Sequence, residues 1–528
     1  MPKDEDKSWL YNLEPIIERW PTVSRPEGHV HFRTKMLWTT GVILTYFILS
    51  NVIIWGLAPD TVDIFAQFRA VLAGASGSII HLGIGPIVTG GIILQLFQGA
   101  NIFDLDLQDP EDKAIYQGTQ KLLVFASIWI TGIPQVFGFL TPSDALIGWT
   151  GTGWARTIIA LQIGLGGYFI FLMDEIISKW GVGSGVSLFI VAGVAQGLFT
   201  GMFSWLPSQA GAALDPIQNP PGGLIPKIFY VTTELPLQQF VSGGGFEQIA
   251  FVGTNSLVSF IATFVIFIGV VFAESTRVEL PLSHARVRGA RGRYPIRLMY
   301  TNVLPLIFVQ ALLANVNLIG ILLWSGPLSN LPLVGNAEWV GSYPFLASGS
   351  AAGGSATQAM SGIAYYVSPI QGLSSWFTPL FAPELAQTVT NVAAYRTSWQ
   401  IAAHVIVYTI AVIVGCIIFA IFWAETASMG PSDVAGKIRN SGMQLPGFRR
   451  DERILERVLE RYIPSVIIIS GFLLGVLAAF AALFGTIGAA QGTGLLLAIG
   501  ILSRTYEEIA KEQMMEMHPM MRSLFGQG

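Results

Sequence analysis

Charged side chains are scarce in this chain of 528 residues. Asp, Glu, Lys and Arg make up 12% of it, and hydrophobic residues make up 52%. A soluble globular protein carries about 25% charged residues. Half that charge cannot cover the water-facing surface of so long a chain, which excludes an ordinary soluble enzyme. Intrinsic disorder is also excluded, because it requires high charge and few aromatic residues.

Catalytic and metal-binding patterns are also missing. Cys416 is the single cysteine, which excludes a disulfide framework and every metal site built from several cysteines. The six histidines show no metal-ligand spacing, and His404 is expected to be a packed or cytosol-facing side chain. The string GPSDVAGK at 430–437 resembles a phosphate-binding loop, but it has one residue too many and is followed by Ile438 instead of Ser or Thr. We therefore expect no catalytic site, no metal and no cofactor.

Long uncharged stretches dominate what is present. A helix that crosses a bilayer needs about 20 mostly apolar residues, and nine apolar stretches without Asp, Glu, Lys or Arg reach or approach that length. The segment 339–383 is also uncharged, but it is rich in Gly, Ser and Pro and is expected to be a long loop. The stretch 462–503 is long enough for two helices, and 70–103 becomes a firm helix only after Gly85-Pro86, since proline fits the first turn of a helix. The sequence thus predicts an all-α integral membrane protein with ten spans, near 36–57, 62–98 (broken into two half-helices), 119–140, 155–174, 185–206, 250–273, 297–323, 399–424, 463–484 and 491–512.

The spans divide into two halves of five. Because five is odd, the second half must run inverted relative to the first, an architecture that recurs in proteins with a central path between the halves. The chain is predicted to begin with a cytoplasmic segment, 1–35, whose residues 8–20 form an amphipathic helix on the membrane surface. The first half, 36–206, is followed by an extracytoplasmic loop, 207–249, the second half, 250–512, and a cytoplasmic tail, 513–528. Within the second half we expect cytoplasmic loops at 274–297 and 425–462 and an extracytoplasmic loop at 324–398.

Basic residues are distributed unevenly between the two sides. With ten spans, both termini share one side, and that side carries 25 of the 29 Lys and Arg residues. The other side carries Arg69, Arg156, Lys227 and Arg396. Because cytoplasmic loops collect Lys and Arg, we expect both termini in the cytoplasm.

No charged side chain stands near the middle of a predicted span. The carboxylates at 174–175, 425 and 507–508 lie at cytoplasmic ends, and Asp63 and Arg69 lie in the first half-helix of the broken span. A secondary transporter for a small solute usually has a charged site at mid-depth, and a membrane-embedded enzyme needs a catalytic pair there. Both remain alternatives, but the sequence favours a protein that moves or admits something by shape.

Two cytoplasmic loops are strongly basic. Residues 274–297 contain six Arg against two Glu, and residues 447–463 begin with a basic cluster that leads into a charged helix. One interpretation is anchoring to anionic lipid head groups, at about 1 kcal/mol per basic residue. The other is docking of a polyanion such as RNA, whose binding releases counterions. Composition alone favours the lipid interpretation.

Several local strings point to one family. They are GIGPIVTGGIILQL at 83–96, GVGSGVSLFIVAG at 181–193, RYPIRLMYTNVLP at 293–305, RYIP at 461–464 and GTGLLLA at 492–498. Together with ten spans, they closely resemble the SecY family, whose members form the channel subunit of the protein translocase. The archaeal and eukaryotic branch is the more similar one. The resemblance covers nearly the whole chain, apart from the loops 207–249 and 324–398, which look longer than the family leads us to expect.

The resemblance implies a clamshell in the cytoplasmic membrane with an hourglass pore between its halves. A ring of apolar residues closes the pore, a plug fills its outer funnel, and the clamshell opens sideways to release apolar segments into lipid. The implied partners are a small single-span SecE-like subunit, a second small SecG- or Sec-beta-like subunit, a ribosome or other motor, signal peptides and nascent chains, and membrane lipids.

The resemblance also assigns residues. The positions that match the pore ring are Ile84, Val88, Val186, Ile190, Ile307 and Leu497, all aliphatic. The plug is expected at about 61–73, with Asp63, Phe65, Gln67, Phe68 and Arg69. The lateral-gate positions are Thr89, Thr131, where relatives carry Gln or Glu, and Asn315. The positions for docking a ribosome or other partner are Arg286, Arg288, Arg449 and Arg450.

Overall fold

The structure is a computed structural model of the whole chain. It describes residues 9–28, 30–58, 72–99, 102, 105, 109–138, 140–207, 214–217, 219–242, 244–251, 255–284, 291–325, 338–343, 359–381, 397–427, 429–440, 443–444, 452–488 and 491–517.

Ten main helices correspond to the ten predicted spans. They are α2 (Phe32–Asn51), α4 (Gly85–Gly99), α5 (Pro110–Gly138), α7 (Thr152–Trp180), α8 (Gly185–Phe203), α12 (Leu257–Ser275), α13 (Leu304–Ser325), α18 (Ser398–Thr426), α20 (Glu452–Phe484) and α21 (Gln491–Met517). Among the described residues, seven helices are long and apolar enough to cross a membrane: α5, α7, α8, α12, α13, α18 and α20. The apolar helix α4 is shorter, as expected for the second half of a broken span.

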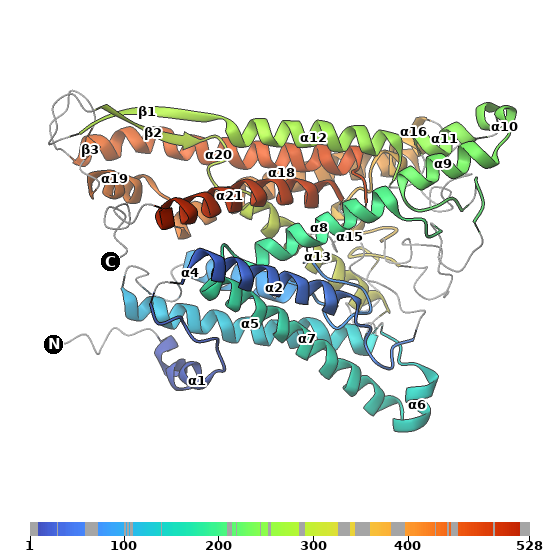
Figure 1. Cartoon of the computed structure of the whole chain (residues 1–528), viewed down its shortest axis with the longest axis horizontal. Coiled ribbons are helices and arrows are strands. Elements are labelled where there is room, and N and C mark those ends of the chain that lie inside the picture. The colour runs from blue at the N-terminus through green and yellow to red at the C-terminus, as the bar shows by residue number, and fades with distance from the viewer. Residues whose placement is uncertain are drawn as a thin grey trace.

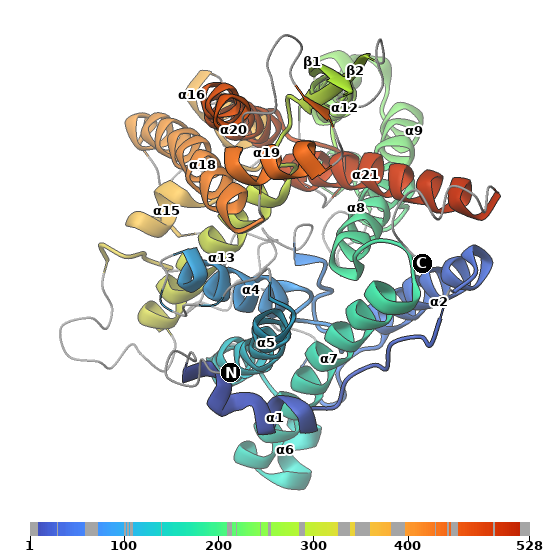
Figure 2. The same cartoon turned by 90° about the vertical axis from the view of Figure 1, so that its left-hand side faces the viewer.

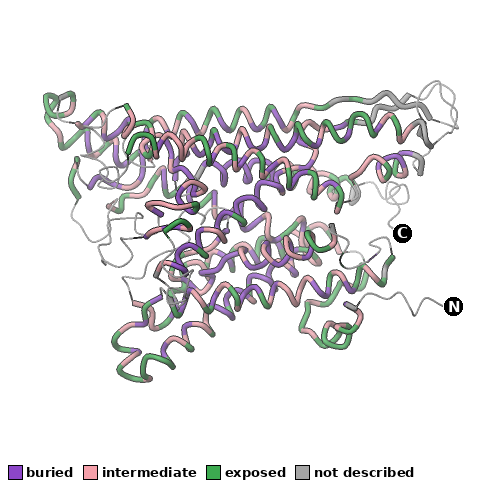
Figure 3. Tube along the Cα trace, turned by 180° about the vertical axis from the view of Figure 1, so that it is seen from behind, coloured by how far each residue is buried: buried purple, intermediate pink, exposed green. Residues whose placement is uncertain are grey.

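The helices form two groups that meet along the middle of the molecule. In Figure 1, α2, α4, α5 and α7 lie on one side, and α12, α18, α20 and α21 lie on the other. The end-on view of Figure 2 shows α8 and α13 where the two groups approach each other. Buried residues concentrate along this middle zone in Figure 3, and exposed residues lie on outward faces. Many outward side chains are apolar, for example Ile130 and Phe272, each more than 70% exposed, as lipid-facing surfaces require.

Both ends of the described chain lie at the same end of the bundle. The short elements η1 (Trp9–Leu13) and α1 (Glu14–Arg19) lie there, as does the C-terminal end of α21 (Figure 1). The short helices α6 (Asp144–Thr150), α9 (Leu224–Glu234), α10 (Leu237–Ser242) and α11 (Gly245–Ala250) lie at the opposite end. An even number of spans requires this arrangement.

A small β-sheet is formed by the segments 274–297 and 425–462, which were predicted to be loops. Strands β1 (Arg277–His284), β2 (Arg291–Arg297) and β3 (Met443–Gln444) pair antiparallel in the order β2-β1-β3. The segment RVEL at 277–280 alternates polar and apolar residues, which is the pattern of a strand. The fold is therefore all-α in its spans, with a ribbon added at the end that carries α1.

Two of the predicted spans begin several residues too early. The span expected from 297 begins at Leu304, because the chain is still in β2 up to Arg297 and then turns through Asn302, whose φ is +59°. The span expected from 250 begins at Leu257, after α11 has ended and Ser256 has capped the new helix by accepting a bond from Ser259 N. Such caps satisfy backbone N–H groups that the first turn leaves unpaired.

The two long extracytoplasmic loops of the prediction contain further helices. Residues 207–249 include α9, α10 and most of α11. Residues 324–398 include α15 (Ile363–Val367), η3 (Leu373–Ser375) and α16 (Phe377–Phe381). The predicted cytoplasmic loop 425–462 includes α19 (Pro431–Asn440).

The N-terminal segment packs against α5. The two helices approach closely at Gly118 of α5, where an added Cβ would lie only 2.2 Å from Ile17 of α1. Trp20 stacks edge-on against Phe125 of α5, with ring centroids 4.9 Å apart. The predicted amphipathic segment is thus attached to the bundle through a specific contact.

Candidate functional site

The six residues predicted to form a pore ring all lie in or against one apolar core. Val88, on α4, and Ile84, which precedes it, are joined there by Ile190 and Val186 of α8, Ile307 of α13 and Leu497 of α21. All except the half-buried Val186 are at most 8% exposed. The part of this apolar core that holds the six residues is therefore built from α4 and α8 of the first half and α13 and α21 of the second. Because the core includes many other residues, the assignment of these six to a ring stays a prediction.

The segment 72–84 connects the predicted plug to α4. Tyr46 of α2 donates its hydroxyl proton to Ala73 O over 2.8 Å, and Ile84 N donates to Leu72 O over 2.7 Å. Gly83 has a φ of +58°, and an added Cβ there would lie 2.1 Å from Leu72 O. The segment is therefore held tightly against the first half. The plug residues Asp63, Phe65, Gln67, Phe68 and Arg69 lie outside the described residues.

Polar side chains meet where α4 and α5 of the first half face α13 of the second. Thr89, Thr131 and Asn315 line one cavity of about 20 Å³, which has room for about one water molecule. Asn315 Nδ2 donates to Ala311 O over 2.9 Å and to Thr89 Oγ1 over 3.5 Å, whereas Thr131 Oγ1 donates within its own helix to Ser127 O. The structure thus brings the three predicted gate residues together.

A fourth residue of this cavity, Gln135, was not predicted from the sequence. It lines the same cavity and is completely buried. Its position four residues after Thr131 places both side chains on one helix face, and this spacing was the available signal. We call Thr89, Thr131, Gln135 and Asn315 the gate seam.

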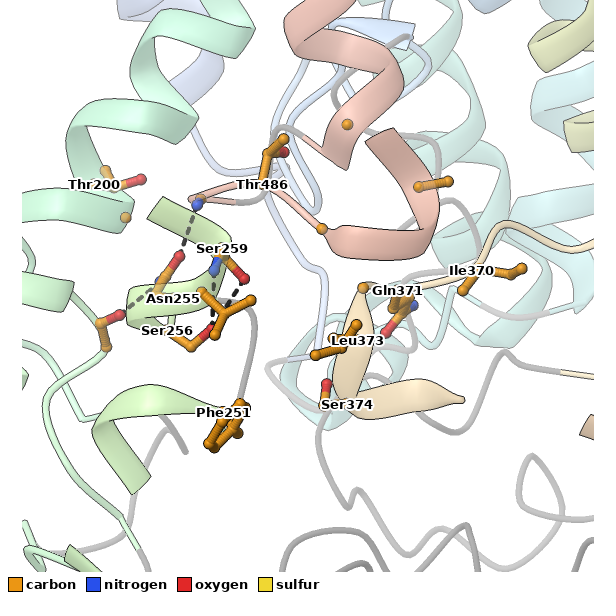
Figure 4. A pocket seen from close by; sticks show the side chains of 18 of the residues that line it. Thr200, Phe251, Asn255, Ser256, Ser259, Ile370, Gln371, Leu373, Ser374 and Thr486 are labelled. Atoms are coloured by element: carbon orange, nitrogen blue, oxygen red, sulfur yellow. Dashed lines mark hydrogen bonds between the residues drawn. The ribbon is translucent and has the colours of Figure 1, made fainter. Parts of the chain in front are cut away.

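A second contact between the halves consists of backbone. Gly488, which precedes α21, has a φ of +81°, and an added Cβ would lie 2.0 Å from Gly197 O of α8. A Cβ on Gly201 of α8 would lie 2.5 Å from Gly488. Asn255 accepts a hydrogen bond from Gly488 N and donates one to Gly222 O, each over 2.6 Å (Figure 4). We call Gly197, Gly201, Gly488 and Asn255 the glycine seam.

A cavity of about 380 Å³ adjoins the glycine seam (Figure 4). Both halves line it, with Thr200 and Ser204 from the first and Ser256, Ser259 and Thr486 from the second. Within the described part of the chain, no charged side chain lines it. The polar groups of its lining are therefore neutral hydroxyls, such as those of Thr200, Ser259 and Thr486.

Ion pairs connect α21 to both halves at the end that carries β1. Glu512 pairs with Lys35 of α2 over 3.0 Å, and Glu507 pairs with Arg297 over 2.5 Å and with Arg277 over 3.8 Å. The predicted docking residues Arg286, Arg288, Arg449 and Arg450 lie outside the described residues.

His404 is a packed residue, one of the two expected environments. Its Nε2 lies 2.9 Å from Ser368 O, and its ring lies 4.5 Å from that of Tyr365. Both partners belong to the segment around α15, so His404 helps to hold that segment against α18.

Comparison with known proteins identifies the family. Residues 78–506 match the SecY family, and residues 44–77 match the plug domain of Sec61p. The chain belongs to the SecY family. The resemblance read from local strings is therefore confirmed, and the ten spans in two halves fit the SecY fold.

Archaeal relatives match the chain over its full length. The protein translocase subunit SecY of Haloferax volcanii is 46% identical over 528 residues, which cover 98% of this chain and 99% of the relative. That of Archaeoglobus fulgidus is 44% identical over 519 residues, covering 98% of each. This member of the SecY family is accordingly a multi-pass membrane protein.

Solved structures agree. One described as "The structure of a protein conducting channel" matches with a TM-score of 0.71 and 32% identity, covering 96% of this chain and 98% of that one. Sec61 in a canine ribosome–channel complex matches with a TM-score of 0.69 and 31% identity, over the same shares of the two chains. The SecY-family fold therefore extends over nearly all of this chain.

Proposed function

We propose that this chain is the channel-forming subunit of a protein translocase. It passes unfolded secretory polypeptides across the membrane and releases apolar segments sideways into the lipid. The observation that carries the proposal is the SecY match over residues 78–506, preceded directly by a plug-domain match over 44–77.

The proposed seal is a ring of the six aliphatic residues around Ile84 and Ile190. Water in a narrow apolar constriction lacks hydrogen-bond partners and withdraws, which stops ions as well. A passing polypeptide of any sequence still fits, because dispersion contacts are non-directional. The channel is passive and has no enzymatic activity of its own, so a docked ribosome or another motor supplies the energy.

The proposed exit into lipid is the gate seam. Asn315 and Thr89 join the halves there through one long hydrogen bond beside a small cavity. An interhelical hydrogen bond in a membrane contributes about 0.6 kcal/mol on average. A seam held this weakly can open for a signal peptide and close behind it.

The proposed setting is the cytoplasmic membrane, with both termini and the β-ribbon in the cytoplasm. The excess of Lys and Arg on that side supports this orientation. The proposed partners are a single-span SecE-like subunit, a second small SecG- or Sec-beta-like subunit, and a ribosome at the basic loops. The match to ribosome-bound Sec61 supports the last of these.

The test of the seal is the resting current of the purified complex in planar bilayers. Replacing Ile84 and Ile190, both fully buried, by Asn should raise the resting ion conductance, because polar side chains retain water in the constriction. Deleting residues 61–73 should add brief openings, because the plug no longer covers the ring.

Ile261 and Ile268 of α12 provide the matched control, because they are 55% and 64% exposed on an outward face. Their replacement by Asn should leave the current unchanged. If the variant at Ile84 and Ile190 stays as tight as the wild type, the ring is not formed by these residues.

The test of partner docking is charge reversal. Replacing Arg286, Arg288, Arg449 and Arg450 by Glu should weaken ribosome binding strongly, and wild-type binding should fall steeply with salt. Membrane insertion should stay normal. Unchanged ribosome affinity would instead assign these residues to lipid anchoring.

A further inference from the structure

Two short helices at the end of the bundle that carries α6 expose apolar side chains at helical spacing (Figure 1). On α9, Ile225 and Phe229 are exposed, and on α10, Leu237 is 83% and Val241 is 67% exposed. The members of each pair are four residues apart, so they share one face of their helix. A helix face that met only water would carry polar residues at such positions.

The remaining sides of the two helices differ from these faces. On α9, Leu224 and Val231 are buried. On α10, Gln239 is exposed, and because it follows Leu237 by two residues, it lies about 200° around the helix from it. An exposed helix with one apolar and one polar side is typical of a helix that lies along the boundary between lipid and water.

The two threonines that end the exposed side of α9 have bonded hydroxyl groups. Thr232 Oγ1 donates to Ile228 O over 2.7 Å, and Thr233 Oγ1 donates to Phe229 O over 2.8 Å. Burying a hydroxyl group away from water is costly only when it lacks a partner. Because both hydroxyls bond within their own helix, this side of α9 can face lipid.

Charged side chains avoid the apolar faces of the two helices. In the described residues of α9, α10 and α11, the charged side chains are Lys227, Glu234 and Glu247. Lys227 is buried, and its Nζ lies 3.5 Å from Asn255 O, so it points away from the exposed face. Glu234 follows Ile225 by nine residues, which places it about 180° around α9. Glu247 lies on α11.

Exposed tryptophans mark the level of the bilayer boundary at this end of the bundle. Four of them, each more than half exposed, lie in or next to α2, α6, α7 and α8: Trp55, Trp149, Trp154 and Trp205. Tryptophan is enriched where a membrane meets water. The ring centroid of Trp205 lies 6.1 Å from that of Phe229 on α9. The exposed face of α9 is therefore at the level of these tryptophans.

The apolar surface of α9 continues that of α8. Phe199 and Phe203 are exposed on α8, with ring centroids 5.0 Å apart, and Trp205 follows them. Gly223 N, at the start of α9, donates to Ser204 O, at the end of α8, over 2.8 Å. Since α8 is long and apolar enough to cross the membrane, its outward face meets lipid. This continuity favours lipid as the covering of α9 and α10.

We propose that α9 and α10 form an interfacial membrane anchor in the leaflet at the end of the bundle that carries α6. The four exposed apolar residues lie among the lipid chains, and Gln239 faces water. Both helices belong to the connection between α8 and α12, which joins the two halves. The anchor fixes this connection at the membrane surface, whatever passes through the channel.

The test measures the surroundings of a fluorescent label in the purified protein, reconstituted in phosphatidylcholine vesicles. Cys416 is the single cysteine and is fully buried, so a cysteine introduced at an exposed position can be labelled selectively. The labelled variants are Leu237→Cys, Val241→Cys, Gln239→Cys and, as a reference on the exposed face of α12, Ile268→Cys. One quencher is a nitroxide on the lipid chains, and the other is iodide in the water.

The labels at Leu237 and Val241 should lose most of their fluorescence to the nitroxide lipid and be shielded from iodide, as the label at Ile268 is. Gln239→Cys is the matched control, because it is exposed on the other side of the same short helix. Its label should be quenched by iodide and much less by the nitroxide lipid. Because phosphatidylcholine has no net charge, this pattern would be due to apolar contact.

Two results would overturn the anchor. If iodide quenches the label at Leu237 as strongly as the label at Gln239, the apolar face is in water. If the label at Leu237 is shielded from both quenchers, another subunit or a second copy of this chain covers the face.

A charged substitution provides a second measurement. With the label at Leu237, Val241→Asp should decrease quenching by the nitroxide lipid, because a carboxylate draws this face toward water. Gln239→Asp, on the water-facing side, should leave the quenching unchanged. An equal result for the two substitutions would contradict the orientation proposed for α10.

Discussion

The two halves of the molecule meet in two contrasting ways. At the gate seam, side chains of α4, α5 and α13 surround a cavity of about 20 Å³, and the hydrogen bond from Asn315 to Thr89 is 3.5 Å long. At the glycine seam, backbone of Gly488 touches backbone of α8, and Asn255 holds Gly488 N and Gly222 O through bonds of 2.6 Å within the second half and to the preceding loop. The first contact is loose and polar, and the second is tight.

This difference assigns a direction to the opening of the proposed clamshell. Close-packed interfaces resist separation, because every small displacement loses contacts. A contact that depends on one long hydrogen bond at the edge of accepted geometry loses little when it opens. In the proposed clamshell we therefore expect the glycine seam to act as the hinge and the gate seam to be the edge that opens.

The largest effect is expected from filling the glycine seam. Gly488→Val places a branched side chain at a left-handed φ and against Gly197 O. Backbone strain of this kind and overpacking each contribute about 1–3 kcal/mol. We expect the purified complex to lose several kcal/mol of stability and to assemble poorly, as measured by yield and melting temperature.

The control for this substitution is Gly153→Ala on α7, where an added Cβ meets nothing within 4 Å. It should leave both quantities unchanged. A normal melting temperature for Gly488→Val would show that the seam is not tightly packed.

The next effect is expected at Asn255. Asn255→Ala leaves Gly222 O and Gly488 N without their partner, at a cost of about 1–3 kcal/mol each. The melting temperature should fall clearly. The same change at the exposed Asn51, which bonds within its own helix, should shift stability by about 0.5 kcal/mol or less. If both substitutions lowered the melting temperature equally, the two bonds of Asn255 would not stabilise the glycine seam.

A smaller effect is expected at the gate seam. Thr89→Val removes the acceptor of the 3.5 Å bond, while Asn315 keeps its bond to Ala311 O. The loss should be about 0.6–1.7 kcal/mol, or about 3- to 15-fold in resting open probability. Thr45→Val, at an exposed threonine that bonds within α2, should change nothing. A rise of several hundredfold after Thr89→Val would mean that this seam is stronger than its geometry indicates.

The smallest effect is expected from the ion pair between α2 and α21. Lys35 and Glu512 are partly exposed, and pairs of this kind contribute about 0.2–1 kcal/mol. Lys35→Met should lower the melting temperature slightly at low salt and not at all at 1 M salt, where charges are screened within about 3 Å. An undiminished effect at high salt would point to packing instead of charge.

The spans could be predicted because a bilayer imposes length and polarity on every helix that crosses it. Gly85-Pro86 also correctly indicated where the firm half of the broken span begins. The β-ribbon was missed because its arginines led us to interpret the segment as a charged loop, although RVEL alternates as a strand does.

Contacts between distant residues could not be predicted from the sequence. Gly488 requires a glycine because of Gly197 O, which lies 291 positions earlier in the chain. His81 and Gln135 were each visible as polar residues among apolar ones, but their pairing depends on how segment 72–84 folds back against α5. Thr131 lines the same cavity as Thr89 and Asn315, yet its side chain bonds within its own helix, and its role at a gate stays a prediction.

The β-ribbon is joined to α12 almost without interruption. A single residue, Thr276, separates the helix from β1. Its N–H continues the helix by donating to Phe272 O over 3.2 Å, and its carbonyl accepts from Leu298 N of the returning chain over 3.0 Å. In Figure 1 the ribbon continues the line of α12. Ribbon and helix are therefore continuous, and we expect a force applied to β1 and β2 to be transmitted through Thr276 to α12 and so to the second half of the molecule.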